Sequence, residues 1–459
     1  MCSTHQESIS LIKKLKNVMY EERVSMQKIH LKSPGNWIND PNGFIYYKGK
    51  YHLFYQYFPY EPRWGTMHWG HAISSDLTNW EHKGIALFPS KFDDKNGCFS
   101  GSAIEHDGKL YIFYTGVRYL KSNPQDIHRC LDEKFVAAQM MITSEDGFKF
   151  DNINDKKTVI PPIEDENIGC ITNTRDPKVW RGKDAWYLMV GSRTSQNNGQ
   201  LLFYRSNDLN NWEYVNSVSK KGFGWMWECP DYFKVDDEEI LVFSPMNISD
   251  KEYCNLSVCT TVKFNEESCE MDIPDKYQML DYGSDLYAPQ STVDADGRRV
   301  LVAWARMPEP VDGKWSGMFC IPRVVEVRNG HICFKVHPNI QKQYSRMITS
   351  VEEADEAGYH ISIDMNNCDC IDIGGYIITC KEDKICTDRS KVFRGHDEIR
   401  SSFETPEIKG KIHLDIYVDN NLIETYINDG EYVISNVVYD LGGHLIVHSG
   451  NKPELYTLQ

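Results

Sequence analysis

The amino-acid sequence predicts an all-β protein: a five-bladed β-propeller followed by a C-terminal β-sandwich, with a short helix at the N-terminus. Three observations support this fold class. A strand-like run of aromatic and aliphatic residues recurs five times, polar hairpin tips recur between the runs, and the pattern changes to short alternating strands after residue 340. Several strands per repeat at a long, regular period are typical of propeller blades.

The five strand-like runs define the blades of the predicted propeller, which spans residues 28–335. Each run follows a polar or charged turn, and the runs lie at 50–58, 109–117, 184–192, 239–246 and 299–307. Three hairpin tips share a serine, an acidic turn and an aromatic residue, and they lie at 74–80, 144–150 and 206–212. An irregular β-sandwich with coincidental internal similarity is the alternative interpretation.

The other two segments complete the predicted organisation. Residues 345–459 are expected to form a smaller all-β domain, because Ile412, Leu414, Ile416 and Val418 alternate with polar neighbours as in a two-sheet sandwich. Residues 1–27 carry apolar side chains at helical spacing and are expected to form a short amphipathic helix.

Composition excludes several classes of function. The chain has 459 residues, of which 41% are hydrophobic and 25% charged, as in globular proteins. The net charge of −16 argues against a nucleic-acid partner. No apolar run reaches the length of a membrane span, and the N-terminus lacks the apolar core of a signal peptide. With 14 cysteines and no CxxC pair, we expect reduced thiols and a cytoplasmic location.

Carboxylates occupy equivalent places shortly before three of the five runs. They are Asp40, Asp176 and Glu228, and a proline follows each within two residues. Proline cannot donate to a strand ladder, so these prolines are expected at strand ends, at the mouth of a central funnel. Because the innermost strand of each blade lines the channel of a propeller, the three carboxylates are expected to converge there.

Three converging carboxylates require an explanation, because like charges repel and raise one another's pKa. Capping, turns or ion pairing would explain each one singly, but equivalent positions in three repeats favour a site. Without a His or Cys cluster nearby, metal binding is the weaker alternative, and we expect no metal and no cofactor. A pair of carboxylates in an aromatic-lined funnel suits glycoside hydrolysis, in which one attacks and the other protonates the leaving group.

Four motifs make the expectation more specific. WINDPNG at 37–43, FSGSA at 99–103, RDP at 175–177 and WECPD at 227–231 resemble the signature motifs of glycoside hydrolase family 32, the β-fructosidases. The resemblance covers about residues 28–459 and implies a five-bladed propeller with a sandwich and a retaining mechanism. It implies that Asp40 is the nucleophile, Glu228 the general acid/base, and Asp176 the residue that holds fructosyl hydroxyls and stabilises the transition state.

The resemblance also implies a fructose subsite. Its expected lining residues are Asn39, Gln56, Trp64, Phe99, Ser100 and Arg175. Tyr287 and Trp304 are further candidates, for which core packing is the alternative. Trp225, Trp227 and Cys229 are expected to supply an apolar wall for Glu228.

The expected activity is retaining hydrolysis of terminal, non-reducing β-D-fructofuranosides, with sucrose or sucrose 6-phosphate as the small-molecule substrate. Arg63, His68 and Lys121 are candidates to face a phosphate, although a solvated surface role is the default for each. The alternatives are a fructan hydrolase or fructosyltransferase of the same fold, an inverting five-bladed glycosidase acting on arabinose or xylose, and a non-catalytic sugar-binding propeller. Whether the chain is a monomer or a homo-oligomer stays open.

Overall fold

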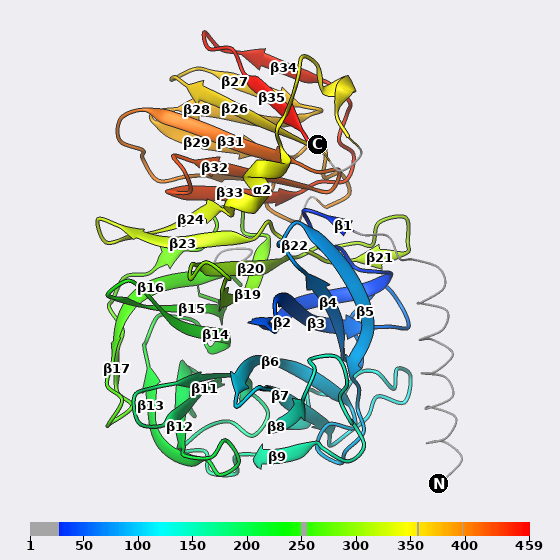
Figure 1. Cartoon of the computed structure of the whole chain (residues 1–459), viewed down its shortest axis with the longest axis vertical. Coiled ribbons are helices and arrows are strands. Elements are labelled where there is room, and N and C mark those ends of the chain that lie inside the picture. Colours follow the sequence, from blue (N-terminus) through cyan, green and yellow to red (C-terminus); the bar gives the residue numbers. More distant parts are fainter. Residues whose placement is uncertain (1–26, 249–254, 356–357, 397) are drawn as a thin grey trace.

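The computed structural model describes residues 27–248, 255–355, 358–396 and 398–459. Five sheets surround a common centre and two further sheets stack beside them (Figure 1), which confirms the predicted propeller and sandwich. The predicted helix at 1–27 lies outside the described residues, except Gln27, which begins strand β1 (Gln27–Lys28).

Each blade is an antiparallel sheet whose first strand lies innermost. Blade 1 contains β2 (Asn36–Tyr47), β3 (Lys50–Phe58), β4 (His68–Ser74) and β5 (Asn79–Leu87). Blade 2 contains β6 (Gly97–His106), β7 (Lys109–Tyr119), β8 (Phe135–Ser144) and β9 (Lys157–Ile160). Blade 3 contains β10 (Arg175–Arg181), β11 (Trp186–Arg193), β12 (Gly199–Ser206) and β13 (Glu213–Ser219).

The last two blades carry short additional strands. Blade 4 contains β14 (Met226–Val235), β15 (Glu238–Met246), β16 (Val258–Phe264), β17 (Met271–Asp272) and β18 (Gln278–Met279). Blade 5 contains β19 (Leu286–Val293), β20 (Arg299–Ala305), β22 (Met318–Phe319), β23 (Arg323–Arg328) and β24 (His331–Val336). Strand β21 (Trp315–Ser316) runs parallel to β2 and joins the sheet of blade 1.

The innermost strands close a ring. β2 contacts β6, β6 contacts β10, β10 contacts β14, β14 contacts β19, and β19 returns to β2. Figure 1 shows β2, β6, β14 and β19 around the centre, and β5, β9, β13 and β17 at the periphery. The five recurrent runs form the second strands β3, β7, β11, β15 and β20, as the repeat predicts.

The hairpin tips recur because each has the same hydrogen-bonded turn. In the turns between β4 and β5, β8 and β9, and β12 and β13, the acidic residue accepts backbone N–H groups two and three residues further on. These acceptors are Asp76, Asp146 and Asp208. A carboxylate that satisfies two backbone donors of its own turn stabilises a tight chain reversal.

Separate hydrophobic clusters fill the spaces between neighbouring blades. Phe54 and Tyr114 belong to the cluster between blades 1 and 2, and Met189 and Phe243 to the one between blades 3 and 4. Both faces of the second strands are buried, so these strands have almost no exposed positions. The blades therefore adhere through apolar packing, and the ring that results holds the innermost strands in place around the channel.

The C-terminal sandwich consists of two antiparallel sheets. One contains β25 (Arg346–Ile348), β35 (Glu454–Thr457), β26 (Tyr359–Met365), β31 (Ile412–Val418), β32 (Leu422–Ile427) and β33 (Tyr432–Val437). The other contains β30 (Ser402–Glu404), β29 (Lys384–Asp388), β28 (Tyr376–Lys381), β27 (Cys370–Ile373) and β34 (Leu445–His448). Alternate residues of β31 are buried between them, as predicted.

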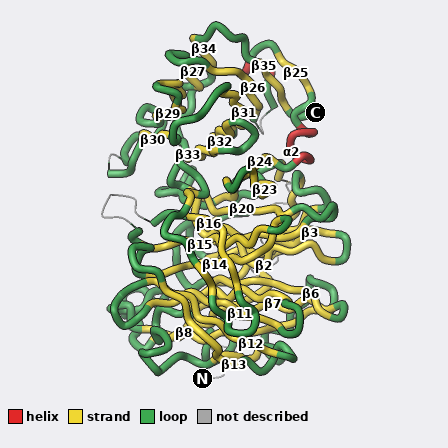
Figure 2. The backbone as a smooth tube through the Cα atoms, turned by 90° about the vertical axis from the view of Figure 1, so that its left-hand side faces the viewer, coloured by secondary structure: helices red, strands yellow, loops and turns green. Residues whose placement is uncertain are grey.

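The sandwich packs on the propeller through a buried apolar and ionic junction. Tyr417 and Tyr426 share one cluster with residues of blades 4 and 5. Within it, the fully buried Arg323 of blade 5 pairs with Glu424 of the sandwich at 2.7 Å, and His30 contacts the same carboxylate at 2.9 Å. Figure 2 shows the short helix α2 (Pro338–Gln343) beside this junction.

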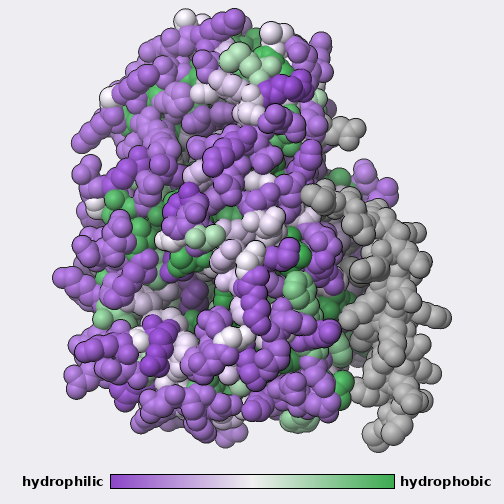
Figure 3. Space-filling view, in the orientation of Figure 1, coloured by the Kyte–Doolittle hydropathy of each residue, from purple (hydrophilic) through white to green (hydrophobic). Residues whose placement is uncertain are grey.

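The described part of the chain contains no helix of the length and apolar character that a membrane crossing needs. The face drawn in Figure 3 is mostly hydrophilic, with smaller hydrophobic areas scattered over it.

Candidate active site

A break in strand register recurs at the same level of all five innermost strands. The breaks lie between Ile38 and Pro41 in β2, Cys98 and Gly101 in β6, Arg175 and Lys178 in β10, Glu228 and Asp231 in β14, and Tyr287 and Gln290 in β19. Such bulges redirect side chains and are frequent beside active sites. Here they lie at the sequence motifs, and they turn the motif side chains toward the channel.

The prolines of the motifs lie within the strands and not at strand ends, so that part of the sequence prediction is wrong. Pro177 and Pro230 lie inside a bulge, and Pro41 follows one directly and pairs with Tyr55, so each proline lies where the ladder is interrupted. The residues before two of them, Asp176 and Cys229, have φ of 69° and 48°. Left-handed backbone at non-glycine residues is costly and concentrates at functional sites.

One cavity of about 640 Å³ at the centre of the propeller is lined by all eleven residues that the sequence analysis expected in the catalytic group and the fructose subsite. These residues are Asn39, Asp40, Gln56, Trp64, Phe99, Ser100, Arg175, Asp176, Glu228, Tyr287 and Trp304. They come from all five blades or the loops between their strands, as expected for a site built by converging innermost strands.

Asp40 is held by three donors. Ser100 Oγ donates to Oδ2 at 2.5 Å, Asn39 Nδ2 donates to Oδ1 at 3.0 Å, and the Cys229 thiol lies 3.5 Å from Oδ2. Burial raises the pKa of the Asp40 carboxyl, the hydrogen bonds from Ser100 and Asn39 oppose this rise, and the charge of Glu228 adds to it. The donors fix the direction of the carboxylate while leaving it close to the other two acids.

Asp176 is buried deeper, with 6% of its surface exposed. The backbone N–H of Cys229 donates to its Oδ2 at 2.9 Å, and the Asp176 N–H donates to Thr115 Oγ1 at 2.9 Å. Burial raises the pKa of Asp176 to about 7, and the charges of Glu228 and Asp40 act in the same direction against the opposing effect of Arg175.

Glu228 has polar partners on both carboxylate oxygens. Arg175 donates to Oε1 from Nε at 3.0 Å and from Nη2 at 2.7 Å, and the Tyr287 hydroxyl donates to Oε2 at 2.6 Å. Trp225 lines the same cavity, but Trp227 is fully buried and donates its indole N–H to the Phe223 carbonyl. The apolar wall expected for Glu228 is therefore incomplete, because polar groups occupy most of it.

The three acids share the site with one closely held cation. Arg175 contacts Glu228 directly and its positive charge also acts on Asp176. With all three carboxyls ionised, the group would carry two net negative charges, so a proton shared among them lowers their repulsion. Burial and the charges of neighbouring carboxylates raise the pKa of both Asp40 and Asp176.

Several lining residues were missed by the sequence analysis. They are Arg129, Cys130, Glu133, Phe135, Asn173 and Met246. Most of them belong to the loops before β8 and β10. These loops lie outside the repeated motif positions, so the repeats did not predict them as site residues. The proposed phosphate contacts are not among the lining residues: Arg63 pairs with Glu61 and Asp126, His68 is buried, and Lys121 pairs with Asp132.

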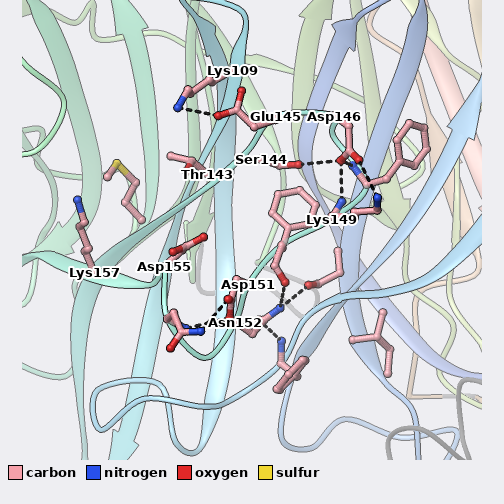
Figure 4. A pocket seen from close by; sticks show the side chains of 17 residues that line it. Lys109, Thr143, Ser144, Glu145, Asp146, Lys149, Asp151, Asn152, Asp155 and Lys157 are labelled. Atoms are coloured by element: carbon pink, nitrogen blue, oxygen red, sulfur yellow. Dashed lines mark hydrogen bonds and ion pairs between the residues drawn. The ribbon is translucent and has the colours of Figure 1, made fainter.

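A second cavity, of about 840 Å³, lies between the outer strands of blades 1 and 2. Figure 4 shows that its polar side chains bond largely to one another. Lys109 pairs with Glu145 at 2.7 Å, and Asp146 accepts the N–H groups of its own turn. It contains none of the motif residues, so the smaller central cavity is the candidate active site.

Comparison with known proteins agrees with this geometry. The model of the glycosyl hydrolases family 32 N-terminal domain matches residues 30–338, and that of the family 32 C terminal matches residues 342–455. A sucrose-6-phosphate hydrolase of Escherichia coli is 33% identical over 89% of this chain and 88% of that protein. A raffinose invertase of the same organism is 32% identical over 89% and 88%.

A solved structure shares the whole architecture. It is a variant of a GH32 β-fructofuranosidase from Bombyx mori in complex with sucrose, with a TM-score of 0.81 and 27% identity over 98% of each chain. A five-bladed propeller with converging carboxylates at its centre, joined to a sandwich, defines a glycoside hydrolase. The chain belongs to glycoside hydrolase family 32.

Proposed function

We propose that the enzyme hydrolyses terminal, non-reducing β-D-fructofuranosides with retention of configuration. Asp40 is the nucleophile, Glu228 the general acid/base and Asp176 the residue that binds fructosyl hydroxyls and stabilises the transition state. The observation that carries this proposal is the convergence of three differently partnered carboxyls in one cavity, where Asp40 accepts from hydroxyl and amide donors and Glu228 from Arg175 and Tyr287.

In the first step, an Asp40 oxygen attacks the anomeric carbon of the fructosyl unit. Ser100 and Asn39 orient the carboxylate for that attack. The protonated Glu228 carboxyl gives its proton to the glycosidic oxygen as the bond to the leaving sugar breaks. The products of the step are a free alcohol and a fructosyl ester on Asp40, and the oxocarbenium character between them is stabilised by nearby carboxylate charge.

In the second step, Glu228 takes a proton from water, and the water oxygen attacks the same anomeric carbon. The ester bond breaks and Asp40 leaves as a carboxylate, so two inversions give net retention. Arg175 and Tyr287 hold the Glu228 carboxyl from opposite oxygens, so its direction is fixed for both proton transfers.

The proposed substrates are sucrose and sucrose 6-phosphate. The Bombyx mori structure in complex with sucrose supports the first, and the name of the Escherichia coli sucrose-6-phosphate hydrolase supports the second. Arg129 lines the cavity with its side chain half exposed, 3.6 Å from Asp126. Arg129 carries a positive charge at the opening of the cavity, and it forms no ion pair with the three carboxylates of the site. We therefore assign Arg129 to a phosphate on the leaving sugar.

Steady-state kinetics on sucrose, sucrose 6-phosphate, raffinose and inulin test the function, with Arg129→Gln as the specificity variant. We expect turnover of sucrose and sucrose 6-phosphate, and a KM for sucrose 6-phosphate that rises about tenfold in Arg129→Gln while sucrose kinetics stay unchanged. Turnover of none of the four fructosides would contradict the proposed function. Equal effects of Arg129→Gln on both sucroses would contradict only the phosphate contact.

We further propose that the propeller spans residues 28–335 and the sandwich residues 345–459, and that the enzyme acts in the cytoplasm. The limits of the two family models, near residues 338 and 342, support the division. The twelve cysteines of the described residues are all free thiols, and free thiols in this number are typical of a reducing compartment.

A further inference from the structure

A thiol that the proposed reaction does not use accepts three hydrogen bonds beside the active-site cavity. Cys170 is half-buried in the loop between β9 and β10. Its Sγ accepts from the backbone N–H of Asn173 at 3.4 Å, from Asn173 Nδ2 at 3.7 Å and from Arg193 Nε at 3.4 Å. The Cys170 N–H donates to Ser192 Oγ at 3.3 Å and its carbonyl accepts from Thr174 Oγ1 at 2.7 Å, so its backbone is held as well.

Asn173 connects this sulfur to the acids of the site. Its Oδ1 accepts from Arg175 Nη1 at 2.9 Å, and Arg175 donates to Glu228 Oε1 through two other nitrogens. An asparagine amide has a donor end and an acceptor end. Because the sulfur accepts from Nδ2, the oxygen is left to face the guanidinium, whereas the reversed amide would place two donors against each other.

Arg193 links the same sulfur to a second lining residue of the cavity. Its Nη1 donates to Asn197 Oδ1 at 2.7 Å, and its guanidinium lies 5.7 Å from the ring centre of Trp225, a lining residue. Burial raises the pKa of the Cys170 thiol, but the hydrogen bonds from Arg193, Asn173 and Thr172 outweigh that effect and hold it below its usual value.

We propose that Cys170 is a positioning residue for the reaction, whose sulfur orients the Asn173 amide and thereby holds Arg175 against Glu228. This inference rests on the proposed function, because Glu228 must exchange its proton at a defined place. A cysteine that served only to fill space would have no effect on the amide, on the guanidinium or on proton transfer.

The first test compares Cys170→Ala and Cys170→Ser with the unmodified enzyme by steady-state kinetics on sucrose across pH. We expect Cys170→Ala to lower kcat about tenfold, the effect of one lost charge-assisted hydrogen bond, with little change in KM. We expect the basic limb of its kcat profile to move to higher pH, because Arg175 is held less firmly. Cys170→Ser keeps an acceptor and should recover part of kcat. Cys370→Ala, at a half-buried thiol of the sandwich, is the matched control and should match the unmodified enzyme.

The second test combines Cys170→Ala with Asn173→Ala. If Cys170 acts through Asn173, the double variant loses no more kcat than Asn173→Ala alone, because the sulfur then has no amide to orient. Losses that multiply in the double variant would overturn the inference, and so would a Cys170→Ala enzyme with unchanged kcat and pH profile. An unmodified enzyme that turns over no fructoside would contradict the proposed function and this inference together, whereas an active enzyme indifferent to Cys170→Ala contradicts the inference alone.

Discussion

Replacing Asp176 with asparagine should stabilise the folded enzyme at neutral pH while it impairs catalysis. The folded protein raises the pKa of this carboxyl from its usual value near 3.8 to about 7, chiefly through burial. Between these two values the folded state binds more protons than the unfolded chain, so the stability falls as pH rises from about 4 to about 7. Above pH 7 the ionised carboxylate costs the folded state its full penalty.

The size of the effect follows from the pKa. One pH unit of separation is worth about 1.4 kcal/mol, so a separation of about three gives about 4 kcal/mol as an upper value. Asparagine still buries a polar group, although its Oδ1 can accept from the Cys229 N–H as Asp176 does. We therefore expect Asp176→Asn to gain about 1–3 kcal/mol at pH 8 and to raise Tm by a few degrees.

Thermal unfolding at pH 8 and at pH 4 is the assay. The gain in Tm should be present at pH 8 and nearly absent at pH 4, where the carboxyl of the folded enzyme is protonated and the penalty for burying its charge has disappeared. Asp208→Asn, in a turn of the same blade, is the matched control, because the fold shifts the pKa of Asp208 in the opposite direction and the expected change in Tm is also opposite. The N–H groups of Asn211 and Asn210 hold the pKa of Asp208 down to about 2, so its loss should lower Tm at pH 8. A lower Tm for Asp176→Asn at pH 8 would refute the reasoning.

Three further substitutions, one of them followed across pH, test other parts of the same structure. Asp40→Asn should lower kcat on sucrose by more than about 10³-fold with unchanged circular dichroism, because an amide cannot form the fructosyl ester; near-normal turnover would remove Asp40 as nucleophile. Glu228→Ala should lose far more activity on sucrose than on an activated aryl β-fructofuranoside, whose leaving group hardly needs a proton, and equal losses would leave the acid unassigned. Burial alone would raise the pKa of Glu424, but the contacts with Arg323 and His30 outweigh burial and hold this pKa near 2. The ion pairs of Glu424 therefore stabilise the fold above about pH 4.5, and this stabilisation is lost as pH falls toward 2. Glu424→Gln should therefore lower Tm at pH 7, by an amount that shrinks below pH 4.5, and a Tm unchanged at pH 7 would contradict this account of the junction.

The fold could be predicted from the sequence because its repeats are strong. The second strand of each blade is buried on both faces, so it reads as a long apolar run, and three tips repeat the same acidic turn. An apolar run of this length predicts a strand from its own residues, without any information about the neighbouring blades. The bulges were not predictable, because a one-residue break in register changes no hydrophobic pattern, and the motif prolines were consequently placed at strand ends.

The residues of the candidate site that belong to sequence motifs could be predicted, and those that belong to loops of irregular length could not. The eleven proposed residues line one cavity. The three carboxylates occupy equivalent places in a ring of blades and must meet at its centre, whereas subsite residues such as Gln56 and Trp64 were implied by the family resemblance. Arg129 and Asn173 belong to loops of irregular length, so no repeat position identified them. Trp227 was misplaced because adjacent strand residues point to opposite faces, and the bulge at Glu228 decides which face meets the cavity.

The anomer of fructose released first tests the central claim most directly. Proton NMR of the unmodified enzyme with sucrose, recorded before mutarotation, distinguishes the two anomers of the fructose product. A covalent ester on Asp40, resolved by water that Glu228 activates, predicts that β-fructofuranose is released first. Initial release of the α anomer would mean a single displacement by water, and it would contradict the assignment of Asp40 and Glu228 as nucleophile and acid/base of a retaining enzyme.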